Sequence, residues 1–119
     1  MARADFAFIN FDQQFDTGNP RATRTWFVDG VPTGHGYLLI QHLDVELPGH
    51  RIRINDRDLP QFDIPAQNEI DQLWRLWMDR IPPGFIQQGE NRVTIIRSTT
   101  AGTEAFRVAN VVVHWREAD

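Results

Sequence analysis

The sequence predicts an all-β fold, a jelly-roll β-sandwich of about eight antiparallel strands with at most one short helix. Turn-forming residues recur about every ten residues, as short strands in such folds require. Between the turns lie runs of β-branched and aromatic residues, several of which alternate apolar with polar side chains. The chain has 119 residues and no cysteine. We therefore expect one domain, residues 1–119, whose core forms without disulfides.

Strands are predicted at residues 5–11, 23–28, 37–46, 51–55, 92–97 and 106–115. The clearest alternation is Arg51-Ile52-Arg53-Ile54, with isoleucines directed inward and arginines outward. The last run changes phase near 109–110, which predicts a β-bulge there. A turn is predicted at 32–34. The predicted core residues are Ile52, Ile54, Val93, Ile95, Phe106, Val111 and Val113.

The segment at 66–76 fits two patterns. Ile70, Leu73, Trp74 and Trp77 follow the spacing of one helix face, whereas the stretch from Trp74 onward also alternates as a strand does. We expect a short helical turn around 68–72 that runs directly into a strand.

Several short motifs follow one another in the second half of the chain. Ile54 is followed by Asn55-Asp56, a Pro82-Pro83-Gly84 turn comes next, and Gly89-Glu90-Asn91 opens a later strand. In this order, over residues 37–115, they resemble the galactose-binding-domain-like jelly rolls, which include many carbohydrate-binding modules. Asp56 departs from the glycine usual in that family. The run from Val111 to Glu117 resembles the ending of small uncharacterised bacterial proteins.

The resemblance implies a fold, but domains of this kind serve as sugar-binding modules, adaptors and assembly subunits, so function does not follow from fold alone. The formal net charge of −4 opposes binding to nucleic acid or to an anionic membrane. No run approaches the roughly 20 apolar residues that span a bilayer. No apolar leader follows Met1, so we expect a cytoplasmic location, with export by another route left open.

The sequence shows no sign of an enzyme. Ser98 is the only serine, and no nucleophile elbow or phosphate-binding loop is present. We expect no cofactor and no metal ligands, although two alternatives stay open. Asn55, Asp56 and Asp58 could offer oxygens to a structural calcium or simply form a polar hairpin. His42 and His114 could face each other across strands as zinc ligands or be ordinary histidines.

The candidate ligand-binding residues are Trp74, Arg75, Trp77, Asp79 and Arg80. A sugar needs an apolar platform for its ring and polar groups for its hydroxyls, and this segment offers both within a few residues. The sequence thus favours a non-catalytic, carbohydrate-binding recognition module. The alternative is a structural subunit with a protein partner, either a component of a homo-oligomer or phage-like particle, or an adaptor. In that case the same indoles would pack in a core or an interface.

Overall fold

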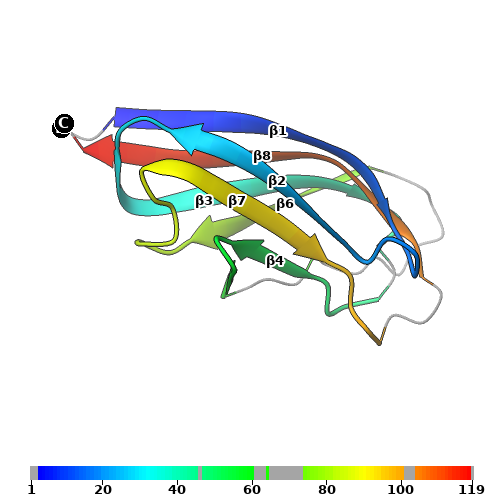
Figure 1. Ribbon diagram of the computed structural model, residues 1–119. Coiled ribbons are helices and arrows are strands. Elements are labelled where there is room, and N and C mark those ends of the chain that lie inside the picture. The colour runs from blue at the N-terminus through cyan, green and yellow to red at the C-terminus, as the bar shows by residue number, and fades with distance from the viewer. Residues whose placement is uncertain (1–2, 46, 61–63, 65–73, 101–103, 119) are drawn as a thin grey trace.

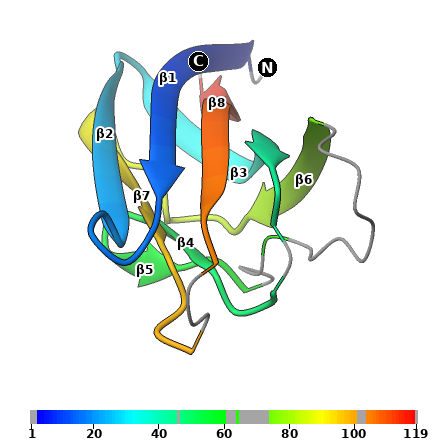
Figure 2. The same ribbon diagram turned by 90° about the vertical axis from the view of Figure 1, so that its right-hand side faces the viewer.

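The structure is a computed structural model that describes residues 3–45, 47–60, 64, 74–100 and 104–118. Eight antiparallel strands form two four-stranded sheets that pack face to face (Figures 1 and 2). Sheet A has the order β1 (Arg3–Phe15), β8 (Phe106–Ala118), β3 (Val31–Leu43) and β6 (Arg75–Ile81). Sheet B has the order β2 (Arg21–Val28), β7 (Gly89–Ile96), β4 (Arg51–Ile54) and β5 (Arg57–Asp58). This arrangement is the predicted jelly roll.

The described residues contain no helix, and so none that could cross a membrane. The helical turn expected at 68–72 lies outside the described residues. The strand expected after it is confirmed as β6.

The core lies between the two sheets. All seven predicted core residues are buried, each with no more than 1% of its surface exposed. Their alternation along β4, β7 and β8 places one set of side chains inward, while arginines of the same strands face outward. The apolar pattern therefore predicted the strand faces correctly.

Truncation of a central core side chain should be costly. We expect Ile54→Ala to lower the free energy of unfolding by about 2–5 kcal/mol, because it removes a fully buried side chain and leaves a cavity. Thr25→Ala, on the exposed face of β2, should change it by less than about 0.5 kcal/mol. Urea denaturation measures both. Losses below about 1 kcal/mol for Ile54→Ala and Ile95→Ala alike would contradict the core assignment.

Two irregularities shape sheet A. β8 skips Ala109 in its pairing with β1 and with β3, which confirms the bulge predicted near 109–110. The turn predicted at 32–34 is wrong. β3 pairs with β8 on both sides of this segment, at Thr33 and again at Tyr37, so the chain does not reverse. Gly34, with φ of 69°, instead absorbs a register shift within one long strand.

The Asn55-Asp56 pair forms a two-residue hairpin between β4 and β5. Both residues have positive φ, 52° and 65°, as a type I′ turn requires, and asparagine and aspartate tolerate this conformation. Asp56 pairs with Arg92 at 2.8 Å, and Asp58 with Arg53 at 2.8 Å. The carboxylates of Asp56 and Asp58 thus bond to arginines. Together with Asn55 they form the polar hairpin that was one of the two predicted alternatives.

Candidate functional site

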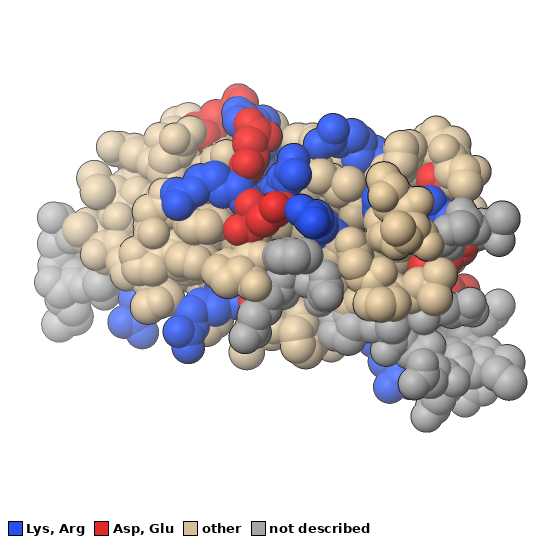
Figure 3. All heavy atoms as spheres, turned by 90° about the horizontal axis from the view of Figure 1, so that it is seen from below, with Lys and Arg blue, Asp and Glu red and all other residues tan. Residues whose placement is uncertain are grey.

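The two outer faces of the sandwich differ in character. The surface seen from the side of β4 and β5 interleaves arginine and acidic side chains (Figure 3). These include the pairs that Arg53 and Arg92 form there. The outer face of sheet A instead exposes large apolar side chains, namely Phe6, Phe8, Tyr37, Leu76 and Met78, each between 43% and 72% exposed. Exposed apolar patches are common at binding surfaces.

Strand register arranges the side chains of this face in rows that run across the strands. The first row contains Phe6 on β1, His114 on β8, Tyr37 on β3 and Arg80 on β6. Directly opposed residues in neighbouring strands lie close enough for their side chains to touch. The Phe6 and His114 rings, for example, have centroids 5.9 Å apart and planes tilted by 31°. The first row therefore forms a band of rings that ends in a guanidinium group.

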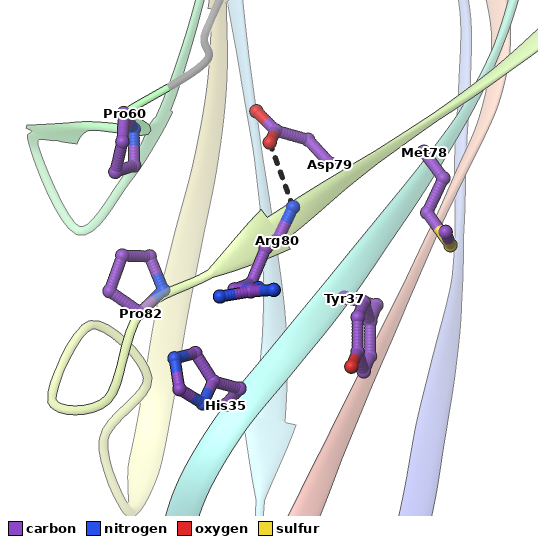
Figure 4. A pocket seen from close by; sticks show the side chains of 7 residues that line it. All are labelled: His35, Tyr37, Pro60, Met78, Asp79, Arg80 and Pro82. Carbon is purple, nitrogen blue, oxygen red and sulfur yellow. Dashed lines mark hydrogen bonds between the residues drawn. The ribbon is translucent and has the colours of Figure 1, made fainter.

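Two hollows flank Tyr37 on this face. The first, of about 460 Å³, lies at the outer edge of sheet A, where β6 ends (Figure 4). The second, of about 290 Å³, lies over β8 and β1. Both hollows are lined by His35, Tyr37 and Met78, so they join into one depression. We name this depression the Tyr37 groove.

Each hollow adds its own polar residues to the three that both share. The first hollow is also lined by Pro60, Asp79, Arg80 and Pro82. The second is also lined by Ala4, Asp5, Leu39, His114, Trp115 and Arg116. Each hollow thus has an arginine beside the shared tyrosine, whereas Asp79 and Asp5 belong by register to the inner face of sheet A. Groups that accept and donate hydrogen bonds beside an aromatic platform are typical of small-ligand sites.

Asp79 is the most perturbed group of the groove. It is only 4% exposed, and burial raises the pKa of its carboxyl, against the opposing effect of a hydrogen bond from the Arg80 amide. That amide donates to Oδ1 at 2.8 Å, whereas Oδ2 accepts no hydrogen bond from the described residues (Figure 4). A buried acceptor without a donor costs free energy.

Two of the five residues predicted to bind ligand line the first hollow. These are Asp79 and Arg80, which lie on opposite sides of β6 (Figure 4). Trp74 and Arg75 are exposed at the start of β6 and line neither hollow. Trp77 is half-buried and packs against the core, because the pleat directs it to the opposite face from Met78. The aromatic platform of the groove is Tyr37 rather than an indole.

The sequence reasoning missed His35, Tyr37 and Phe6. One signal was available, because the first strand carries apolar residues on both faces, with Phe6 and Phe8 alternating against Ile9 and Phe11. A strand with one solvated face places polar residues on that face. Apolar residues on both faces therefore predict an apolar outer face, as the structure shows.

His42 and His114 lie on opposite faces of sheet A. His42 is 2% exposed and faces the interior, whereas His114 belongs to the first row of the outer face. The two imidazoles therefore cannot share a zinc ion. Burial, together with the nearby charge of Arg75, lowers the pKa of His42 to about 4.

This lowered pKa predicts a loss of stability in acid. Between pH 6.5 and about 4 the unfolded chain takes up a proton on His42 that the folded chain does not, so stability falls as pH falls through this window. The loss amounts to about 3 kcal/mol at most. Urea denaturation at pH 7 and pH 4.5 should show a smaller difference for His42→Gln than for the wild type. An equal difference in both proteins would refute this role, and His35→Gln is the exposed control.

Comparisons with known proteins support the fold. The CBM36-1 domain of a multidomain xylanase, from the hindgut metagenome of Trinervitermes trinervoides, superposes with a TM-score of 0.59 at 7% identity, over 92% of this chain and 96% of that domain. The C-terminal domain of EclA, described as a sugar-binding protein, gives a TM-score of 0.53 at 11% identity, over 95% and 78%. The distant structural neighbours thus include sugar-binding domains.

Dimeric latent PorU from Porphyromonas gingivalis also superposes, with a TM-score of 0.65 at 11% identity over 98% of this chain. The chain spans only 13% of PorU, so the likeness concerns one domain of a larger protein. A search of the curated proteins finds no match. The Family of unknown function (DUF7383) matches residues 4–117, and the chain therefore belongs to that family.

Proposed function

We propose that this protein is a non-catalytic recognition module that binds carbohydrate in the Tyr37 groove. The observation that carries the proposal is the exposed Tyr37 ring, which lies between two hollows that are each lined by an arginine. The sugar-binding domains among the structural neighbours support it, since they share the fold.

The groove matches the two surfaces of a pyranose. The ring presents an apolar face of C–H groups, which packs on an aromatic ring such as Tyr37. Its rim presents hydroxyl groups, which both donate and accept hydrogen bonds. Around Tyr37 the Arg80 and Arg116 guanidiniums donate, and the Tyr37 hydroxyl both donates and accepts, so hydroxyls of the sugar find hydrogen-bonding partners.

A glycan array probed with the purified protein, followed by isothermal titration of the glycans it retains, tests this proposal. We expect binding to a subset of glycans with dissociation constants in the range that small interfaces allow, from about micromolar to millimolar. Absence of binding to every glycan on the array would reject the proposal.

A second candidate function is assembly with other protein chains. It is favoured by apolar side chains that lie on the outer face of sheet A but outside both hollows, above all Phe8 and Leu76, which are 62% and 72% exposed. Exposed apolar residues of this size are typical of protein interfaces.

Solution mass separates the two candidates. If assembly is the function, light scattering should show a stable oligomer that Phe8→Ser dissociates, and the array should show no glycan binding. A monomer that binds a glycan would reject assembly. Phe8 serves this purpose because it lies on the face without lining the groove.

A further inference from the structure

We infer that two copies of this chain pair along β6, antiparallel about a twofold axis at Trp77, so that sheet A continues from one copy into the other. The inference goes beyond the proposed function and does not depend on it. Three observations support it: the position of β6 at the edge of sheet A, the exposed apolar side chains along this strand, and the match between β6 and a reversed copy of itself.

Four strands form the edges of the two sheets, and three of them carry features that hinder further pairing. Natural edge strands are usually short, bulged, interrupted by proline or covered. β5 has only two residues, and β1 has a bulge between Asn10 and Gln13. β2 is tied to β1, because Arg24 donates a hydrogen bond to the Phe11 carbonyl at 2.9 Å. β6 differs from all three.

β6 is a regular strand with one edge available for pairing. It has seven residues, no proline and no register shift against β3. Among the described residues it pairs only with β3, and it lies at the end of sheet A (Figure 2). The amide and carbonyl groups along the other edge of such a strand are a template for a further antiparallel strand.

Exposed apolar side chains accompany this edge. Leu76 is 72% exposed and Met78 is 55% exposed, and both lie on the outer face of sheet A. Trp74, immediately before the strand, is 46% exposed and follows the same alternation. A partner strand that offered apolar side chains on the same face would cover them. A second copy of β6 offers these residues.

One antiparallel register matches the outer side chains of β6 to those of its copy. When Trp77 lies opposite the partner's Trp77, Leu76 lies opposite the partner's Met78, and directly opposed side chains of paired strands touch. Trp74 then lies opposite the partner's Arg80, and an indole attracts a guanidinium. The twofold axis repeats each of these pairs.

The charges on the inner side of β6 favour the same register. Arg75 lies opposite the partner's Asp79, so that opposite charges face each other across the strands. Pairing centred on Asp79 or on Arg80 would instead oppose two like charges, which is destabilising. Pairing centred on Met78 would place Leu76 opposite a guanidinium rather than an apolar side chain.

Sedimentation equilibrium over a range of concentrations tests the pairing. We expect a monomer–dimer equilibrium with a dissociation constant of about micromolar, because one pair of strands buries less than a standard interface. Leu76→Lys places a charge opposite Met78 and should weaken the dimer by about tenfold or more. Phe8→Ser is the matched control. Phe8 is exposed on the same face but lies on β1, at the other edge, so the dimer should persist.

Cysteine cross-linking tests the register, since the chain has no cysteine of its own. A mixture of Leu76→Cys and Met78→Cys chains should form a disulfide-linked dimer under mild oxidation, because opposed residues lie within disulfide reach. Neither variant alone should do so, because each cysteine then lies diagonal to its copy, about 7–8 Å away. Thr25→Cys, exposed on β2, mixed with Leu76→Cys controls for random collisions.

Each outcome decides the inference separately from carbohydrate binding. A monomer at every concentration would overturn it, as would a dimer that Phe8→Ser dissociates and Leu76→Lys does not. Cross-linking by Met78→Cys alone would move the twofold axis to Met78 and overturn the register. The glycan array measures a different surface, so its result neither supports nor contradicts pairing along β6.

Discussion

His50→Ala is expected to lower the free energy of unfolding by about 5 kcal/mol, enough to unfold a domain of ordinary stability. The His50 side chain is fully buried. Its Nε2 lies 2.9 Å from Oε2 of Glu104, whose side chain is 3% exposed, and its Nδ1 accepts a hydrogen bond from the Ser98 amide at 2.9 Å. One imidazole thereby connects the loops that follow β3 and β7.

The hydrogen bonds define the state of this imidazole. Because the Ser98 amide donates to Nδ1, the proton resides on Nε2, which donates to the Glu104 carboxylate. The ring also packs on Phe106, with centroids 4.3 Å apart. Alanine would leave a cavity beside Phe106 and would remove the imidazole bonds of a buried carboxylate and a backbone amide. These losses add to one another.

Chemical denaturation of His50→Ala measures this effect. His35→Ala is the matched control, since it removes the same side chain from an exposed position and should change stability by less than about 0.5 kcal/mol. A loss below about 2 kcal/mol for His50→Ala would show that the network contributes less than its burial suggests.

Tyr37→Ala is expected to weaken glycan binding by about thirtyfold, equivalent to about 2 kcal/mol, which is typical of a central aromatic residue in a binding site. The ring is 43% exposed on the outer face, so its removal should leave the core intact. Tyr37→Phe keeps the apolar platform and should lose less than Tyr37→Ala. Unchanged affinity in Tyr37→Ala would remove Tyr37 from the site.

Local patterns in the sequence were sufficient to predict the fold. Alternation at Ile52 and Ile54, and the change of phase at Ala109, depend only on neighbouring residues and on the twofold period of a strand. The structure confirms both. The turn predicted at 32–34 failed because proline and glycine also accommodate bulges within strands, and only pairing with β8 distinguishes the two.

The groove could be predicted only in part, because it depends on contacts between strands that are distant in sequence. Asp79 and Arg80 were identified from their own segment. Tyr37, His114 and Phe6 become neighbours only once the order and register of sheet A are known. Trp74 and Trp77 were predicted to bind ligand because they lie close together along the chain. The pleat of β6 nevertheless turns Trp77 toward the core.

We expect ligand to bind on the outer face of sheet A. The most direct test is to titrate the protein with a glycan retained on the array and to map the backbone amides whose chemical shifts change. We expect the shifted amides to include Tyr37, Met78, Arg80 and His114, which lie on β3, β6 and β8 around the groove. Shifts that centre on Trp74, or on the charged face that contains Arg53 and Arg92, with the four groove amides unmoved, would contradict the account.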